Sequence, residues 1–470
     1  MTGTKRRDRG ASSLWPFLGG ALAGAAGAVL AQALLARRSL DPRLLGPGRH
    51  NPEAPPVVVV PGILGSELLR PDGTHLWLNL RNALGHHDLS LPFRLPFSES
   101  RDDLRPGGLI GVDTVLPRVF GFTEYADLLQ LLASAGFGRD RHERHRAYHV
   151  FTYDWRRDLV ESARRLGEWL DERARSAGDP DLRFSVIGHS MGALVARYYL
   201  RYGSAEPSPD LEVTWAGARR IRSLVMVAPP NGGSIGALDA ILNGTRVGLS
   251  YTTLAASVVA RMPAIYQLLP PKGARPLVDG RGREAGDLHE LLTWDRLGWG
   301  PFRPLPARRR GDESETRRVH DDHVRFLEAA LLRARTFQDA LAAPAKTPCP
   351  IRVVVLGGDC LPTPARALVQ EPRGTPPRLD PWTRAEAELL LEAGDGRVTR
   401  ASAAGAHLPG ADDSESGTGY GEIAQAVFGD AEHHGIYAEP TFQSLLLRLL
   451  LRPSRRASPA ADVAGALAAG

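Results

Sequence analysis

One stretch decides how the rest of the chain is interpreted: Phe184-Ser-Val-Ile-Gly-His-Ser-Met-Gly-Ala-Leu-Val-Ala-Arg-Tyr-Tyr-Leu200. Its first four residues are mostly apolar and β-branched, which predicts a buried strand over 184–187. Residues 191–202 are rich in helix formers and carry apolar side chains at helical spacing, which predicts a helix. The chain therefore passes from a strand to a helix through five residues.

Those five residues, Gly188-His-Ser-Met-Gly192, fit the pattern G-x-S-x-G. The two glycines permit a sharp turn, which would hold Ser190 in a strained conformation with its hydroxyl exposed. A turn with a serine N-cap is the simpler interpretation of the pentapeptide, but its place between a strand and a helix favours a nucleophile. A dinucleotide-binding turn would need G-x-G-x-x-G, which this turn does not supply.

Length and composition restrict the class of protein. The 470 residues can bury a large core, and a hydrophobic content of 43% is ordinary for a globular chain. The net charge of +5 is mild and spread along the chain. It suits loose attraction to an anionic lipid surface better than a nucleic-acid site, so we expect no nucleic-acid partner. Two cysteines exclude a disulfide framework.

The N-terminal segment, residues 1–40, is basic and then apolar. Residues 14–36 carry no charge, and roughly 23 residues are enough to span a bilayer. We expect a membrane anchor or an export signal, with Ala-Gln-Ala at 31–33 as a possible cleavage site. A buried helix in a cytoplasmic protein is the alternative. Residues 41–56 resemble a linker, and residues 453–470 a disordered tail.

Between these termini, residues 57–452 show alternating strand and helix patterns. Strands are predicted at 57–60, 147–153, 184–187, 221–228 and 351–357, and helices at 122–135, 156–176, 191–202, 320–342 and 442–451. Because the strands are apolar throughout, we predict an α/β fold with a mostly parallel sheet covered by helices on both faces. Two long stretches interrupt the pattern and predict a lid at about 66–117 and a cap insertion at about 232–346.

A serine nucleophile needs a base and an orienting acid, which follow it in the order Ser, Asp/Glu, His on a fold of this kind. Asp395 lies in a glycine-flanked turn, whereas Asp359 directly follows the strand at 351–357. His407, His433 and His434 are the candidate bases. The residues alone leave these choices open.

The same fold predicts where the oxyanion is stabilised. One donor is the backbone N–H of Met191, directly after the nucleophile, and the other comes from the loop after the first strand, which points to Ile63. His320 and His323 stand beside two aspartates, but we interpret this group as helix capping and solvated surface and expect no metal site.

Taken in order, six segments resemble the lecithin:cholesterol acyltransferase family, which includes lysosomal phospholipases A and phospholipid:diacylglycerol acyltransferases. The resemblance extends over most of residues 57–450, and Tyr153-Asp-Trp-Arg156 is its most specific match. The segments are Val57-Val-Val-Val-Pro-Gly-Ile-Leu-Gly-Ser66, Leu76-Trp-Leu78, Tyr153 to Arg156, Gly188 to Gly192, Leu361-Pro-Thr-Pro364 and Gly394-Asp-Gly-Arg-Val398.

The resemblance implies an α/β-hydrolase fold and a serine-dependent lipid acyl ester hydrolase or O-acyltransferase, without cofactor or metal. It favours Asp395 as the acid, and His434, in His434-Gly-Ile-Tyr437, as the base. Ser190 would form the acyl-enzyme on a lipid substrate at a membrane surface. Trp155 would line the acyl groove, with an ion pair between Asp154 and Arg156 as the alternative role of this motif. The paired cysteines that clip the lid in some members have no counterpart here.

Two other functions are compatible with the residues. One is an esterase of the same fold that acts on non-lipid esters. The other is a membrane-anchored binding protein that keeps the fold without catalysis. Neither the oligomeric state nor the acyl acceptor, water or an alcohol, follows from the sequence.

Overall fold

The computed structural model describes residues 53–76, 89–110, 112, 124–139, 145–246, 253–303, 313–406 and 421–451. The expected anchor or signal segment, most of the linker and the C-terminal tail lie outside this part of the chain, as do Trp77 and His407. Within the described ranges, no helix is long and apolar enough to cross a bilayer.

The centre of the structure is a seven-stranded sheet in which every neighbouring pair is parallel. The predicted α/β fold with a mostly parallel sheet is confirmed. In spatial order the strands are β15 (Ile423–Gly429), β11 (Arg352–Gly358), β7 (Ile221–Val227), β6 (Phe184–His189), β1 (Val57–Val60), β5 (Ala147–Val150) and β4 (Gly138–Arg139). The strand that leads to Ser190, β6, is the central one.

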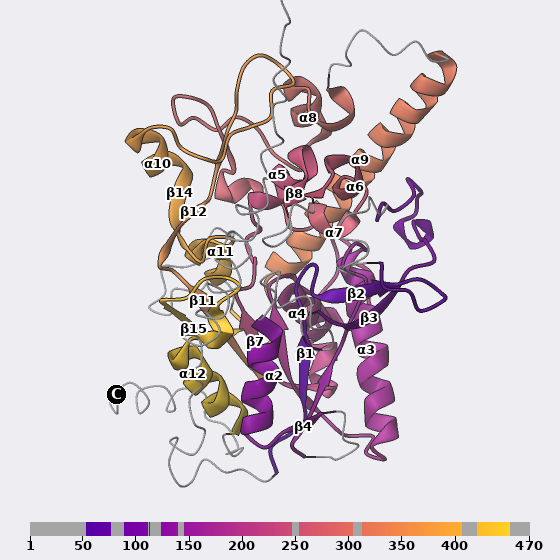
Figure 1. Cartoon of the computed structure of the whole chain (residues 1–470), viewed down its shortest axis with the longest axis vertical. Coiled ribbons are helices and arrows are strands. Elements are labelled where there is room, and N and C mark those ends of the chain that lie inside the picture. Colours follow the sequence, from indigo (N-terminus) through magenta and orange to yellow (C-terminus); the bar gives the residue numbers. More distant parts are fainter. Residues whose placement is uncertain are drawn as a thin grey trace, which may run out of the picture.

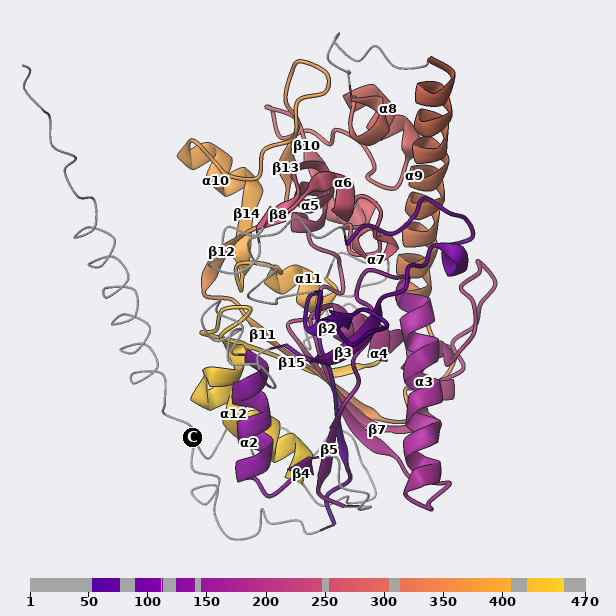
Figure 2. The same cartoon turned by 45° about the vertical axis from the view of Figure 1, so that its right-hand side comes forward.

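Helices cover both faces of the sheet, as β1 illustrates. Val57 and Val59 belong to the core beneath α2 (Glu124–Ser134) and α12 (Pro440–Leu451). Val58 and Val60 belong to the core beneath α3 (Leu159–Ser176) and α4 (Met191–Tyr202). Successive strand residues point to opposite faces, so an uninterrupted valine run is what a doubly covered strand requires. Figure 2 shows α2 and α12 on one side of the sheet and α3 on the other.

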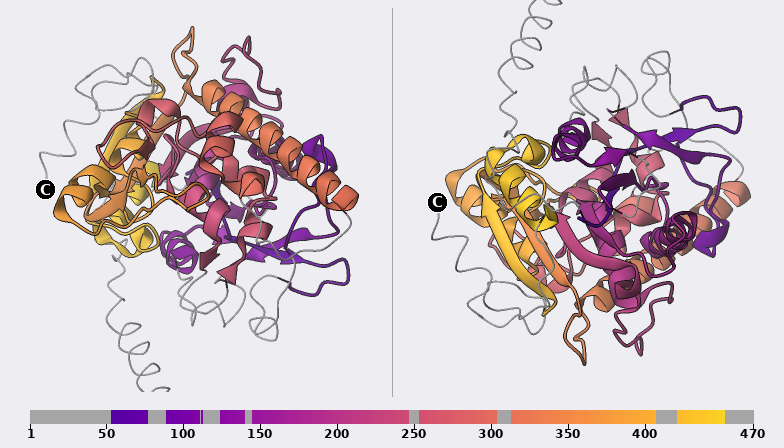
Figure 3. Two further views of the ribbon diagram at one scale, coloured as in Figure 1. Left: turned by 90° about the horizontal axis from the view of Figure 1, so that it is seen from above. Right: turned by 90° about the horizontal axis from the view of Figure 1, so that it is seen from below.

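Residues 232–346, the expected cap insertion, supply a group of helices beyond the carboxyl ends of the strands (Figure 1). They are α5 (Gly236–Asn243), α6 (Ala256–Val259), α7 (Pro263–Tyr266), α8 (Leu291–Leu297) and α9 (Glu313–Ala342). The long helix α9 runs from this group down to α4, where Phe337 stacks on Tyr198 with ring centroids 5.5 Å apart. The view from above in Figure 3 shows α9 crossing the molecule. The cap is thus joined to the body through α9.

Smaller elements complete the chain. The expected lid contributes β2 (Ser66–Leu69) and β3 (Arg105–Leu109), which pair antiparallel, and the acid loop follows β12 (Leu361–Pro364) and β14 (Leu391–Gly394), also antiparallel. The remaining elements are η2 (Phe97–Glu99), η4 (Ala216–Arg219), β8 (Thr245–Arg246), β9 (Thr253–Leu254), η5 (Lys272–Ala274), β10 (Leu277–Val278), η6 (Gly300–Phe302), β13 (Ala367–Leu368), α10 (Arg384–Leu390), α11 (Arg400–Ala404) and η7 (Ile436–Ala438).

Strand β15 was not predicted from the sequence, and its position explains why. It lies at the edge of the sheet and is mostly half-exposed, so it lacks the continuous apolar run of the central strands.

A buried ion cluster joins the start of β15 to α4. Glu422 accepts hydrogen bonds from Arg197 at 2.7 and 2.9 Å and from Arg201 at 2.7 Å. Burial opposes ionisation of Glu422, but the two guanidinium groups prevail and lower its pKa. Asn231, in the loop after β7, is also buried here, and its Oδ1 accepts a hydrogen bond from Arg197 at 3.1 Å. The cluster fixes α4, the helix that follows Ser190.

Candidate active site

The turn that carries Ser190 is strained. Ser190 has φ of 51° and ψ of −125°, a combination that non-glycine residues rarely adopt. A Cβ on Gly192 would lie 2.3 Å from the carbonyl oxygen of Pro61, and a Cβ on Gly188 would lie 2.6 Å from the Cα of Ala193. Both glycines of the G-x-S-x-G pattern are therefore required by close backbone approach.

Three side chains meet at the end of β6. The imidazole Nε2 of His433 lies 3.1 Å from Ser190 Oγ, and its Nδ1 lies 2.8 Å from Asp395 Oδ2. A carboxylate at Nδ1 favours the tautomer with the proton on that nitrogen, which leaves the Nε2 lone pair to accept the serine proton. The geometry is that of a nucleophile, a base and an orienting acid.

The expectation of His434 as the base is corrected by one residue. The backbone N–H of His433 donates to the carbonyl oxygen of Asp395 at 2.9 Å, which holds residue 433 beside the acid. The His434 side chain is exposed at the mouth of the cavity described below, and its ring stands perpendicular to that of His433. The sequence does not show which of the two adjacent histidines faces Ser190, because the backbone geometry of the loop decides this.

The predicted acid, Asp395, is held by its own turn. Asp395 Oδ1 accepts the backbone N–H groups of Arg397 at 2.9 Å and Val398 at 2.7 Å. Burial of Asp395 opposes its ionisation, but His433 and these two N–H groups outweigh burial and lower its pKa. The competing acid, Asp359, instead pairs with Arg400 at 3.1 Å.

The expected oxyanion donors lie on the two loops that meet at Ser190. Met191 follows the serine at the N-terminus of α4, and Ile63 lines the same cavity as the serine hydroxyl. Across the described residues, neither backbone N–H has a hydrogen-bond partner. The neighbouring N–H of Gly62 is already bound to Tyr125 Oη at 2.8 Å. These positions are compatible with the predicted donor pair.

A chain of hydrogen bonds that was not predicted from the sequence links the loop carrying Gly62 to the loop carrying His433. Tyr125 Oη, which accepts from Gly62, lies 2.8 Å from Nδ1 of His189, and Nε2 of His189 lies 3.4 Å from the carbonyl oxygen of His433. Burial, with a smaller effect of the neighbouring histidines, holds the pKa of His189 well below its usual value. His189 is therefore neutral, with one donor and one acceptor nitrogen. The only sequence signal was its position inside G-x-S-x-G.

The Tyr153-Asp-Trp-Arg156 motif contacts the loop after β1, which carries Ile63. Tyr153 Oη donates to the carbonyl oxygen of Pro61 at 2.9 Å, and Trp155 Nε1 donates to that of Ser66 at 3.1 Å. Arg156 pairs with Asp154 at 2.7 Å and with Asp102 of the expected lid at 2.6 Å. The ion pair considered for this motif is present, and Trp155 also lines the cavity.

A cavity of about 200 Å³ extends from Ser190 and His433 into the cap. Its deeper wall is apolar, and its polar groups include Arg397 and His434. The apolar wall residues from the cap are Leu254, Val259, Met262, Ile265 and Leu268. In the described part of the chain, no group of three or more His, Cys, Asp or Glu side chains is arranged to hold a metal ion.

A comparison with models of known protein families agrees with the resemblance found in the sequence. Residues 103–285 match the model of the family described as "Lecithin:cholesterol acyltransferase", which confirms the resemblance over a span that includes the Tyr153-Asp-Trp-Arg156 motif and Ser190. Among curated protein sequences there is no significant match.

Several solved structures are similar to this chain. The chain in the crystal structure of the Tle4–Tli4 complex has 14% identity and a TM-score of 0.46, over 84% of this chain and 98% of that one. The Bacillus licheniformis lipase BlEst2, in mature form, has 12% identity and a TM-score of 0.35, over 86% and 94%. Phospholipase PlaB from Legionella pneumophila has 12% identity and a TM-score of 0.26, over 64% and 39%.

Proposed function

We propose that this protein is a lipid acyl ester hydrolase or O-acyltransferase that works through an acyl-enzyme on Ser190. The observation that carries the proposal is the run of contacts from Ser190 Oγ to His433 Nε2 at 3.1 Å and from His433 Nδ1 to Asp395 at 2.8 Å. The match of residues 103–285 to the acyltransferase family supports a lipid ester as the substrate class.

In the proposed reaction, His433 removes the proton of Ser190 as Oγ attacks the ester carbonyl. Asp395 keeps the ring oriented and stabilises the imidazolium that forms. The N–H groups of Ile63 and Met191 stabilise the oxyanion, and each such donor is typically worth about 3 kcal/mol in the transition state. His433 then protonates the leaving alcohol, and water or a second alcohol releases the acyl group by the reverse sequence.

The cavity supports an acyl chain as the group that is transferred. Aliphatic side chains and the buried Trp155 form most of its wall. Each methylene transferred from water to such a surface contributes about 0.8 kcal/mol. Turnover should therefore rise with acyl length until the cavity is filled.

The test combines covalent labelling with an ester series. A fluorophosphonate probe is expected to label the full chain at Ser190, and p-nitrophenyl esters from acetate to palmitate are expected to give kcat/KM values that rise with chain length. Ser190→Ala should abolish both signals, whereas Ser204→Ala, which removes an exposed serine after α4, should change neither.

The outcomes separate the parts of the proposal. Absence of labelling in detergent and on liposomes would overturn the enzyme function and favour a binding protein. Labelling with activity that falls as the acyl chain lengthens would keep the serine hydrolase and refute the lipid substrate. Adding dodecanol as acceptor then distinguishes transfer from hydrolysis, because only transfer yields the dodecyl ester.

A further inference from the structure

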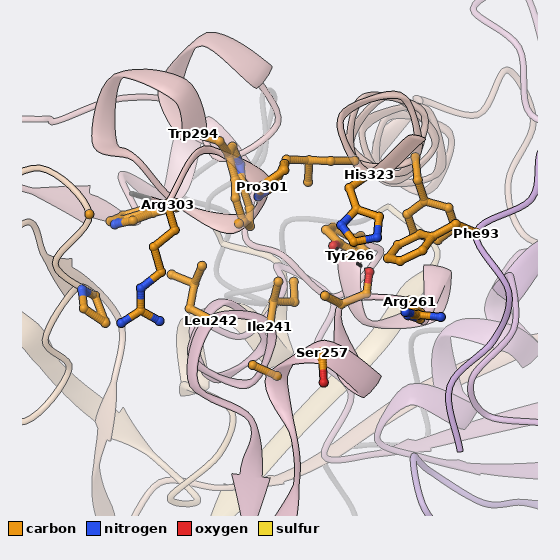
Figure 4. A pocket seen from close by; sticks show the side chains of 18 residues that line it. Phe93, Ile241, Leu242, Ser257, Arg261, Tyr266, Trp294, Pro301, Arg303 and His323 are labelled. Carbon is orange, nitrogen blue, oxygen red and sulfur yellow. Dashed lines mark hydrogen bonds between the residues drawn. The ribbon is translucent and has the colours of Figure 1, made fainter. Parts of the chain in front are cut away.

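The cap contains a second cavity, of about 250 Å³, which the proposed reaction does not use (Figure 4). It shares no lining residue with the cavity at Ser190. The helix α5 forms part of the wall between them: Ile241 and Leu242 line the second cavity, whereas Ala237 and Ala240 line the first. Both cavities therefore lie against the same short helix but on different sides of it.

Aromatic rings form much of the wall of this second cavity, and their polar atoms are bound elsewhere. Trp294 Nε1 donates to the carbonyl oxygen of Leu288 at 2.8 Å, and Trp299 Nε1 donates to that of Thr375 at 3.0 Å. Tyr266 Oη donates to the carbonyl oxygen of Ala260 at 2.9 Å. These rings offer apolar surface to an occupant rather than hydrogen bonds.

Apart from Tyr266, the ionisable side chains that line the cavity are all basic. Arg261 and His323 lie toward one side of the cavity, next to Phe93, and Arg303 lies at the other side (Figure 4). The Arg261 guanidinium is 4.3 Å from the centroid of the Phe93 ring, and the His323 ring is 3.9 Å from it. No Asp or Glu is among the described residues that line the cavity.

Arg261 carries an unused donor at this place. Its Nε is buried and has no hydrogen-bond partner among the described residues, and no carboxylate there forms an ion pair with its guanidinium. A buried donor without a partner carries an uncompensated desolvation cost, which is larger when the group is charged. An anionic group between Arg261 and His323 would relieve this cost.

We propose that this cavity binds a single-chain amphiphile with an anionic head, such as a free fatty acid. The head accepts hydrogen bonds from Arg261 and His323, and the chain lies along the aromatic wall formed by Trp294 and Trp299. The volume of about 250 Å³ is slightly below that of typical ligand pockets, which is roughly 300–1,000 Å³, so the cavity suits one chain rather than two.

Binding is measured by isothermal titration calorimetry on the full chain below the critical micelle concentration, with dodecanoate, dodecyl phosphate and dodecanol. Dodecanoate is expected to show saturable binding that is at least tenfold tighter than that of dodecanol. The titration with dodecyl phosphate shows whether the site binds any anionic head group or prefers a carboxylate. This comparison uses the native protein, so it does not depend on whether a variant folds.

Variants then locate the site. Arg261→Gln should weaken dodecanoate binding about tenfold or more and leave dodecanol unchanged, and Leu242→Trp should block both by filling the cavity. Arg384→Gln, in which an exposed arginine of α10 is replaced, is the matched control and should bind as the native protein does.

Prior reaction of Ser190 with a fluorophosphonate should leave dodecanoate binding intact. Loss of binding after this reaction, equal affinity for dodecanoate and dodecanol, or no saturable binding would each overturn the proposal. Since the readout is binding rather than turnover, a failure of the proposed ester chemistry would not affect it.

Discussion

The two adjacent histidines allow the proposed mechanism to be tested at single-residue resolution. His433 contacts both Ser190 Oγ and Asp395, and His434 contributes neither of these hydrogen bonds. Both lie in the same loop, so the two alanine variants each remove one imidazole and differ only in which of two adjacent positions has lost it. His433→Ala should abolish ester turnover, and His434→Ala should leave most of it.

The size of the difference follows from the contacts. Removing His433 takes away the proton acceptor at 3.1 Å and leaves the buried carboxylate of Asp395 without its partner. Losses from members of such a unit commonly reach about 10⁴-fold or more in kcat, and 10⁴-fold corresponds to about 5.4 kcal/mol at 1.36 kcal/mol per factor of ten. Substitution of an exposed side chain such as His434 usually changes energies by about 0.5 kcal/mol or less, roughly twofold.

The measurement is kcat/KM on a medium-chain p-nitrophenyl ester for both single variants and for the double variant. The double variant should be no slower than His433→Ala alone, because the His434 ring does not act in the same step. Circular dichroism and the thermal midpoint establish that each variant is folded. Equal losses in the two single variants, or a larger loss in His434→Ala, would refute the assignment of the base.

Two further predictions concern residues away from the reacting atoms. Tyr125→Phe removes the hydroxyl between Gly62 and His189 and should lower kcat about tenfold with little change in KM. The control is Tyr199→Phe, which removes a buried hydroxyl that has no hydrogen-bond partner among the described residues and should leave kcat unchanged. Equal kcat in the two variants would contradict a positioning role for the hydroxyl. Glu422→Gln should lower the free energy of unfolding in urea by about 3 kcal/mol at pH 7, because it leaves two buried arginines without their carboxylate. The pKa of Glu422 is lowered in the folded state, so its contribution to stability is complete above the unfolded carboxyl pKa of about 4.3 and is lost as the pH falls through the lower folded value. The difference in unfolding free energy between the native protein and Glu422→Gln should therefore narrow below about pH 4. A difference that stays constant with pH would contradict an ionic origin.

Local features of this chain could be predicted from the sequence, because neighbouring residues determine them. The valine run of β1, the elbow around Ser190 and the helix after it depend on patterns a few residues long. The acid loop was placed by a motif that matches at Gly394-Asp395-Gly396. The edge strand β15 could not be predicted because most of its residues are half-exposed and it carries no continuous apolar run.

The register of the base could not be predicted for a different reason. It depends on a backbone hydrogen bond from residue 433 to Asp395, a contact between residues far apart in the sequence, and both histidines satisfy the motif equally well. The same holds for Tyr125 and His189, whose link exists only once α2 lies beside β6. Contacts between distant loops are set by tertiary packing, which short motifs do not encode.

These contacts explain how a strained turn, an oxyanion loop and a histidine loop keep one arrangement. Gly192 brings the turn that carries Ser190 against the carbonyl oxygens of Val60 and Pro61, so this turn packs directly against the loop that carries Ile63. Tyr125 and His189 extend these contacts to the carbonyl oxygen of His433, and they do so from the face of the sheet that α2 covers. The cap approaches from the carboxyl ends of the strands and supplies most of the cavity's apolar wall. Under the proposed function, the cap would contact the acyl chain, whereas Ser190, Asp395 and His433 are held by loops of the body. The proposed lipid site and the base assignment can therefore be tested independently.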